Sequence, residues 1–172
     1  MKHIILTLTI LISTVGGLYA QTSANTTLNL KINAFQSINV MGDVNLEYRS
    51  INDFSTGVES TMQDHLQVFS TGGFSVYVKA ASNLINGTET IEAEKIKITA
   101  SKGSVATLPS VVFTPVNLKT TPQTIIKSAD GAPTDNFNVT YKAIGNNDNV
   151  NKHKGGSSAV FTTTVVYSIE AS

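Results

Sequence analysis

The sequence HLQVFSTGGFSVYVKAA, from His65 to Ala81, decides the fold class of this chain. Apolar residues occupy every second position on both sides of Thr71-Gly72-Gly73, namely Leu66 and Val68 before it and Phe74, Val76, Val78 and Ala80 after it. This period of two is typical of strands that bury one face. Paired glycines tolerate the positive φ of a tight turn. The stretch therefore predicts two strands joined as a β-hairpin.

The same alternation recurs outward from this stretch. It marks LNLKINAF (28–35) as a first strand, and further runs at 38–40, 44–48, 95–100, 136–144 and 159–172, with a turn predicted at Met41-Gly42-Asp43. Asn86-Gly87 predicts another tight turn. Residues 50–64 show no sustained period and predict a long surface loop, with one short edge strand within it as an alternative. We expect the long apolar run at the C-terminal end to pair centrally, because such a strand at a sheet edge promotes aggregation.

Four prolines, at positions 109, 115, 122 and 133, interrupt the pattern between 104 and 133. Proline removes a backbone donor and is confined to sheet edges, so 111–113 and 124–127 are predicted edge strands.

Two similar stretches, FSVYVKAASN (74–83) and FNVTYKAIGN (137–146), are interpreted as central strands under one packing constraint, with duplication as the alternative. Together these patterns predict an all-β fold: a single antiparallel two-sheet β-sandwich of Ig-like or Greek-key type, with about eight to ten strands.

The first twenty residues are predicted to be a signal peptide. Lys2 precedes an apolar run from Ile4 to Val15, and Gly16-Gly17-Leu18-Tyr19-Ala20 leads to a small residue before Gln21. We expect cleavage after Ala20 and a β-sandwich domain over 21–172. The predicted location is secreted or at the cell surface, with the periplasm as an alternative, and no transmembrane span remains in the mature chain.

Composition limits the classes of partner. Twelve basic residues balance twelve acidic ones, so the chain lacks the basic surface of a nucleic-acid binder or a polybasic membrane anchor. Cysteine is absent, which excludes attachment of a lipid at a processed N-terminal cysteine. A domain of this size is held by its hydrophobic core without disulfides.

Motifs for catalysis are weak. Glu92 and Glu94 are two residues apart and would share one face of a strand, the arrangement of a paired-carboxylate hydrolase. Asp64 beside His65, and the oxygen-rich run Asn146–Asn149, are further candidates for acid–base or calcium chemistry. In each case a solvated strand or loop is the simpler interpretation. We therefore expect no catalytic residue, no metal site and no cofactor.

Two features predict binding rather than catalysis. Tyr77 is predicted to lie on the face opposite Phe74, Val76 and Val78, so it is the best single aromatic candidate for a contact with a glycan, with burial under a loop as the alternative. The apolar residues Leu28, Leu30 and Ile32 follow a polar leader and are a candidate edge strand or donor strand for β-addition to another chain.

Two stretches resemble known families. Gly73-Phe74-Ser75-Val76 and the terminal TTTVVYSIEAS resemble bacterial cell-surface β-sandwich proteins, namely WxL-type wall-binding domains and the spore-coat-U and pilin-like families. The resemblance implies a surface β-sandwich and assigns no functional residue.

These observations predict a non-enzymatic exported protein with a structural or adhesive role. It would form filaments or a matrix with copies of itself by β-strand addition. The alternative is a module that binds glycan or peptidoglycan, in which case the partner is a cell-surface polysaccharide.

Overall fold

A computed structural model describes residues 22–145, 147–153 and 158–172. The chain divides into two units, Met1–Lys31 and Ile32–Ser172. Within the first unit, residues 22–31 form neither helix nor strand. The predicted signal peptide and its cleavage bond lie outside the described residues.

The second unit consists almost entirely of strands. In chain order its elements are β1 (Gln36–Val40), α1 (Ile51–Thr56), β2 (Val58–Ser70), β3 (Phe74–Ala80), β4 (Leu84–Asn86), β5 (Glu89–Ile91), the 3₁₀ turn η1 (Ala93–Lys95), β6 (Ile96–Lys102), β7 (Val112–Phe113), β8 (Val116–Asn117), β9 (Gln123–Ser128), β10 (Ala132–Ala143) and β11 (Val165–Ala171). Neither α1 nor η1 is long and apolar enough to cross a membrane, and no other helix occurs in the described residues.

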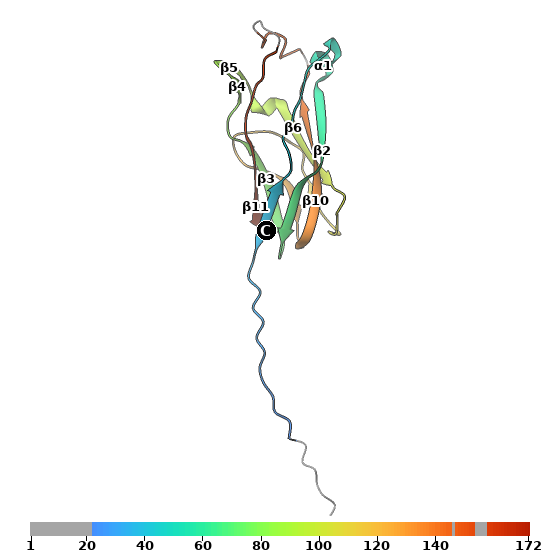
Figure 1. The fold of residues 1–172 in the computed structure, drawn as a ribbon, viewed down its shortest axis with the longest axis vertical. Coiled ribbons are helices and arrows are strands. Elements are labelled where there is room, and N and C mark those ends of the chain that lie inside the picture. Colours follow the sequence, from blue (N-terminus) through green and yellow to red (C-terminus); the bar gives the residue numbers. More distant parts are fainter. Residues whose placement is uncertain (1–21, 146, 154–157) are drawn as a thin grey trace, which may run out of the picture. The chain divides into compact units, whose positions relative to one another are not determined.

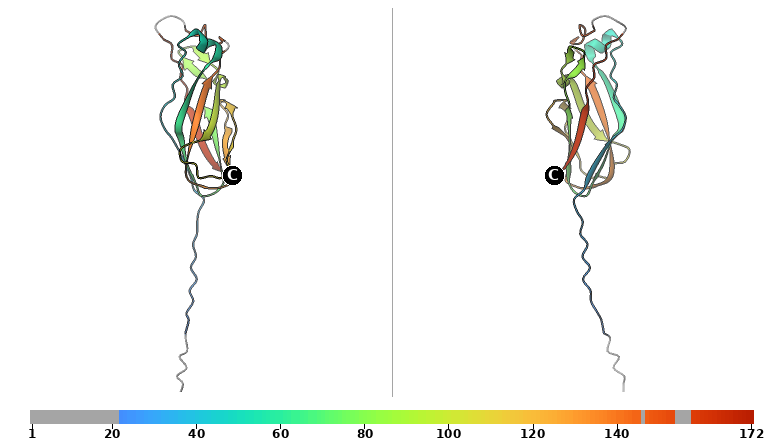
Figure 2. Two further views of the ribbon diagram at one scale, coloured as in Figure 1. Left: turned by 90° about the vertical axis from the view of Figure 1, so that its right-hand side faces the viewer. Right: turned by 60° about the vertical axis from the view of Figure 1, so that its left-hand side comes forward.

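The strands form two main antiparallel sheets (Figure 1; Figure 2). Sheet A has the order β1-β2-β10-β6-β8, and sheet B has the order β11-β3-β9-β7. A separate hairpin, β4-β5, turns at Gly87 with a φ of 56°, which confirms the turn predicted at Asn86-Gly87. The predicted all-β, sandwich-like fold is confirmed.

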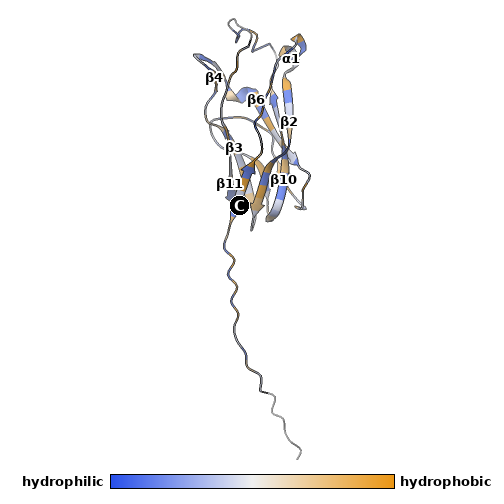
Figure 3. Ribbon diagram, in the orientation of Figure 1, coloured by the Kyte–Doolittle hydropathy of each residue, from blue (hydrophilic) through white to orange (hydrophobic). Residues whose placement is uncertain are grey.

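The core lies between the two sheets and draws on the inner face of each. Sheet A contributes Leu66 and Val68 and the strand β10, and sheet B contributes β3 and β9. Figure 3 shows the mixture of hydrophobic and hydrophilic residues along these strands. β3 and β10 are both interior strands, so the prediction that the two similar stretches are central is confirmed.

The predicted hairpin at the glycine pair is wrong. β2 belongs to sheet A and β3 to sheet B, so the chain passes from one sheet to the other between Ser70 and Phe74. Neither Gly72 nor Gly73 has a positive φ. Alternation reports which face of a strand is buried, but a hairpin and a connection between facing sheets bury their strands equally well. The sequence pattern therefore could not separate them.

Close approach explains why the connection needs glycine at position 73. A Cβ added to Gly73 would lie 2.8 Å from the Ala129 carbonyl oxygen, whereas one added to Gly72 would meet nothing within 4 Å. Overlap with backbone cannot be relieved by a rotamer change, and overpacking of this kind costs about 1–3 kcal/mol. We expect Gly73→Ala to lower the free energy of unfolding by that amount in urea titrations, and Gly72→Ala to change it by less than about 0.5 kcal/mol. Equal effects would contradict this account.

Three further predictions differ from the structure. Residues 50–64, expected to be a loop, contain α1 and the first half of β2. α1 begins with a capping box in which Ser50 and Asp53 exchange hydrogen bonds, a local signal that a search for strand periodicity overlooks. Of the two predicted edge strands, β7 is at an edge but β9 is interior. The C-terminal strand β11, expected to be central, forms an edge of sheet B.

Candidate interaction site at an open edge

The strand β11 is the starting point of the candidate site. It pairs with β3 from Val165↔Ala80 to Ala171↔Phe74. Its other edge forms no backbone hydrogen bond with any described residue. Its inward side chains, Val165, Tyr167 and Ile169, pack against the core but are only partly buried. An edge with free N–H and C=O groups is a template for pairing with another strand.

Sheet A has a corresponding edge on the same side. β1 lies beside β11, and its inward residue Val40 remains 47% exposed. After Gly42, which has a φ of 74°, the chain runs along the sandwich to α1 (Figure 1). Val44, Leu46 and Tyr48 pack against the core, yet no backbone group from Gly42 to Tyr48 bonds to another described residue. We call the free edge of β11 and the segment 42–48 the open edge.

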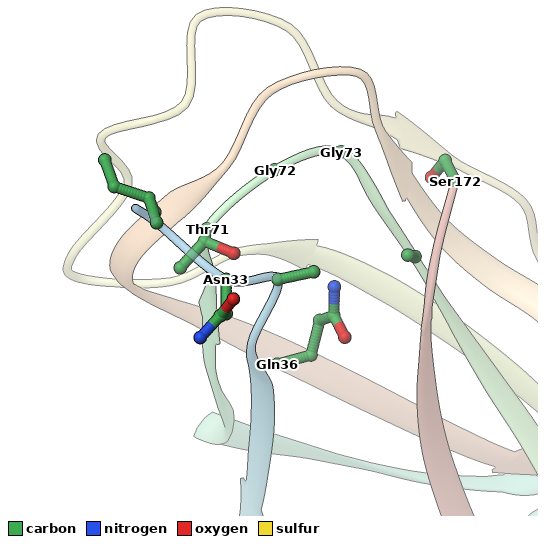
Figure 4. Close-up of a pocket in the computed structure, with 9 residues that line it drawn as sticks. Asn33, Gln36, Thr71, Gly72, Gly73 and Ser172 are labelled. Atoms are coloured by element: carbon green, nitrogen blue, oxygen red, sulfur yellow. The ribbon is translucent and has the colours of Figure 1, made fainter. Parts of the chain in front are cut away.

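A shallow cavity of about 270 Å³ lies at the end of the open edge where the chain enters the sandwich. Figure 4 shows Asn33, Gln36 and Thr71 on one side of it, the backbone of Gly72 and Gly73 above, and Ser172 on the opposite side. Phe35 is fixed there by a hydrogen bond from its N–H to Thr71 Oγ1 of 2.9 Å. The cavity is lined both by Gln36 at the start of β1 and by Ala171 and Ser172 at the end of β11. It therefore lies between the two strand ends next to the open edge.

The residues predicted as a first strand pair with no described strand of this chain. The first strand is β1, and the extended segment before it has exposed fractions of 90% for Leu28, 84% for Leu30 and 76% for Ile32. Large aliphatic side chains usually leave water on folding, so three exposed ones at alternate positions need a partner to be buried. Their role as a donor strand stays a prediction.

A chain of buried hydrogen bonds lies behind the open edge. His65 of β2, only 1% exposed, contacts the Met41 carbonyl through Nδ1 at 2.6 Å and the Tyr141 hydroxyl through Nε2 at 2.9 Å. The Tyr141 hydroxyl in turn bonds the Tyr167 hydroxyl of β11. We call Met41, His65, Tyr141 and Tyr167 the polar bridge, because it joins the end of β1 in sheet A to β11 in sheet B.

A bulge in β2 puts His65 inside. Asp64 has a φ of 50°, and the β2–β10 register shifts between the pairs Phe137↔Leu66 and Val139↔Met62. Both His65 and Leu66 consequently face the interior. The bulge is held by Asp64, whose carboxylate accepts bonds from the Ser104 N–H at 2.7 Å and the Ser104 hydroxyl at 2.6 Å. These bonds lower the pKa of Asp64.

When His65 is neutral, its bonding partners fix the direction of each hydrogen bond in the polar bridge. A carbonyl can only accept, so His65 donates from Nδ1 to Met41, and Nε2 accepts from the Tyr141 hydroxyl. Tyr167 then donates to the Tyr141 oxygen. Burial lowers the pKa of His65, against a smaller rise from its bond to Met41, and raises the pKa of Tyr141 to about 12. Burial likewise raises the pKa of Tyr167. The bridge is therefore neutral at pH 7.

The other candidate residues are not brought together. Tyr77 lies half-buried on the outer face of sheet B, opposite Thr124 and Ser168, and no ring contact to it occurs in the described residues. Glu92 and Glu94 flank the start of η1 and not a strand, so the shared strand face expected for them is absent. The Lys119 Nζ atom lies 3.8 Å from Glu94 Oε1, so Glu94 forms an ion pair with this lysine.

The proposed calcium run falls partly outside the described residues, because Asn146 is not among them. Asp148 forms an ion pair with Lys95 at 2.9 Å, and Asn149 donates to the Tyr48 hydroxyl at 3.2 Å. No cluster of three potential metal-ligating side chains occurs in the described part of the chain. These side chains instead tie a loop to the sandwich.

Sequence reasoning missed the polar bridge and the open edge. Tyr141 is buried and Tyr167 packs against the core, but their pairing with His65 depends on which strands become neighbours. The alternation of Leu66 and Val68 puts His65 on the outer face, and only the bulge at Asp64 turns its side chain inward. Neither a protein-family model nor a curated protein sequence matches the chain.

Proposed function

We propose that this protein is an exported, non-enzymatic structural subunit of the cell surface that assembles with copies of itself by β-strand addition. The donor is the segment from Leu28 to Ala34, and the acceptor is the open edge of the next copy. The observation that carries the proposal is that the described part of one chain has both an apolar strand sequence and a strand edge that pair with none of its other described residues.

The donor and acceptor match in length and pattern. Residues 28–34 span seven positions, as does β11. No proline occurs before position 109, so every residue of the donor can supply an N–H group to a ladder. Leu28, Leu30 and Ile32 share one face and would turn inward, beside the partly exposed inner residues of β11.

The energetics favour addition at this edge. Burying a leucine or isoleucine side chain fully contributes about 1.5–3 kcal/mol. Each new backbone hydrogen bond adds about 0.5–1.5 kcal/mol. Both the donor and the edge must be ordered on association, which opposes these terms. The apolar face of the donor should therefore decide whether association occurs.

Assembly through these two surfaces has no natural end. Donor and acceptor are different surfaces of one chain, so each added copy presents a new donor or a new acceptor. Contacts of this heterologous type produce open filaments unless the rotation between copies closes a ring. This geometry agrees with a role in a filament or matrix at the surface.

Adding two carboxylates to one or the other face of the donor strand tests the proposal. We expect Leu30→Asp/Ile32→Asp to abolish association of the chain expressed from Gln21, because carboxylates cannot be buried at the inner face. The control Asn29→Asp/Asn33→Asp carries the same added charge on the opposite face and should associate normally. Sedimentation velocity, electron microscopy and mildly denaturing gels would measure the assemblies.

The outcomes are distinct. A wild-type chain that stays monomeric at high concentration would contradict self-assembly altogether. Assembly that survives Leu30→Asp/Ile32→Asp would contradict the donor role of this segment. Because these side chains are exposed in the single chain, the substitutions should leave its folding unchanged.

A further inference from the structure

We infer that the polar bridge is a pH-sensitive latch on the open edge: protonation of His65 releases Tyr167 and makes β11 a better acceptor for a donor strand from a second copy. The inference rests on the proposed function, because it assigns regulation to the same acceptor. It is carried by the geometry of the bridge, which connects the two sheets at the margin where a strand would enter.

In the neutral state every polar group of the bridge has a partner. The donors are the His65 Nδ1–H and the hydroxyls of Tyr141 and Tyr167. The acceptors are the Met41 carbonyl, His65 Nε2 and the Tyr141 oxygen. Donors and acceptors balance, so Tyr167 is tied through Tyr141 to sheet A.

Protonation of His65 breaks this balance. Nε2 becomes a donor, so the Tyr141 oxygen must accept from it and the Tyr141 hydroxyl must turn towards Tyr167. The Tyr167 hydroxyl then has no acceptor within the bridge. A buried donor without an acceptor is unfavourable, and so is a buried imidazolium.

Tyr167 offers the easiest relief. His65 and Tyr141 lie on strands paired on both sides in sheet A, whereas Tyr167 lies on an edge strand and is only partly buried. Moving its hydroxyl towards water restores a partner and lets water reach His65. This movement would loosen β11 from sheet A on the side where the donor enters.

The surroundings of His65 isolate it from other charges. Tyr141 faces it from β10 and Tyr167 from β11, with ring centroids 5.6 and 6.1 Å from the imidazole. Met41 faces it with its carbonyl from the end of β1. No charged side chain among the described residues contributes to its lowered pKa, so the bridge responds to pH through this histidine alone.

The direction of the pH effect follows from linkage. The pKa of His65 is lowered in the closed state, whereas an opened state exposed to water regains a value near 6.5. The open state therefore binds more protons, and its population rises as pH falls below about 6.5 and stops rising below the closed-state pKa. One pH unit changes the ratio of open to closed molecules by at most about tenfold.

A peptide-binding assay tests the latch. The probe is a capped, fluorescent peptide of residues 25–35, which contains no histidine, aspartate or glutamate. The acceptor is the full chain from Gln21 carrying Leu30→Asp/Ile32→Asp, which lacks a competing donor of its own. We expect the association rate to be up to about tenfold higher at pH 5.5 than at pH 7.5.

Two histidine variants provide a matched comparison. His65→Gln cannot gain a proton but can still donate to Met41 and accept from Tyr141, so its association rate should not depend on pH. His153→Gln removes the histidine of an exposed loop and should keep the full dependence. If His65→Gln fails to fold, Tyr167→Phe serves instead, because it lacks the hydroxyl that the latch releases and should associate rapidly at both pH values.

The outcomes separate the latch from the proposed function. Peptide that binds at neither pH would overturn strand addition itself. Peptide that binds at the same rate at both pH values, or a pH dependence retained in both His65→Gln and Tyr167→Phe, would overturn the latch and leave strand addition standing.

Discussion

A disulfide should form between copies when a Leu30→Cys chain is mixed with an Ile169→Cys or a Val165→Cys chain under mild oxidation. The wild-type chain has no cysteine, so each variant carries one thiol of known position. Adjacent strands bring facing side chains to about 4.5–5.5 Å between Cβ atoms, close enough for a disulfide after small adjustment. At least one of the two positions on β11 should lie opposite the donor cysteine.

The matched control uses the other edge of sheet B. Val112 lies on β7, an edge strand like β11, and its side chain is exposed. Docking raises the local concentration of the two thiols to about 1 mM, so at about 10 μM protein cross-linking to β11 should be faster than to Val112→Cys by about a hundredfold. Mass spectrometry of the mixed dimer would identify the pair. Equal rates at both edges would show that β11 is not the acceptor.

Phe137→Ala should lower the free energy of unfolding by about 3–5 kcal/mol, because it removes a fully buried ring and leaves a cavity. Phe137 is inaccessible to water, pairs with Leu66 across β10 and β2, and contacts the Phe113 ring edge-on at 6.0 Å. It therefore joins an interior strand of sheet A to the edge strand β7 of sheet B. Such a loss is a large part of the roughly 5–15 kcal/mol that stabilises a typical domain.

The control is a phenylalanine on the outer surface. Phe69 is 37% exposed and contacts the exposed ring of Phe35 at 5.7 Å. We expect Phe69→Ala to cost less than about 1 kcal/mol in the same urea titration. A loss below about 1.5 kcal/mol for Phe137→Ala would mean that the two sheets are held together elsewhere.

Much of the strand content could be predicted because burial imposes a local pattern. Phe74, Val76 and Val78 alternate in the sequence, and each is inaccessible to water in the structure. The same holds for Phe137 and Val139 on β10. A strand with one face on a core must show this period whatever its neighbours are.

The candidate site could be predicted only in part. The apolar alternation of Leu28, Leu30 and Ile32 identified a strand sequence, and its exposure explains why it differs from the core strands. The position of β11 was predicted incorrectly, since an apolar strand was expected to be central. The error points to the site: an apolar strand with the pattern of a central strand lies at the edge of sheet B.

The sequence by itself determined that this protein is an all-β chain, because inward and outward residues alternate along each strand regardless of the order in which the strands pair. The tertiary structure alone decided that β2 and β3 enter different sheets, that β11 and segment 42–48 leave an open edge, and that His65 meets Tyr141 and Tyr167. These features depend on contacts between residues as much as 102 positions apart, from His65 to Tyr167. A periodic pattern carries no information about such pairings, since strands with the same inner face can exchange places without changing the pattern.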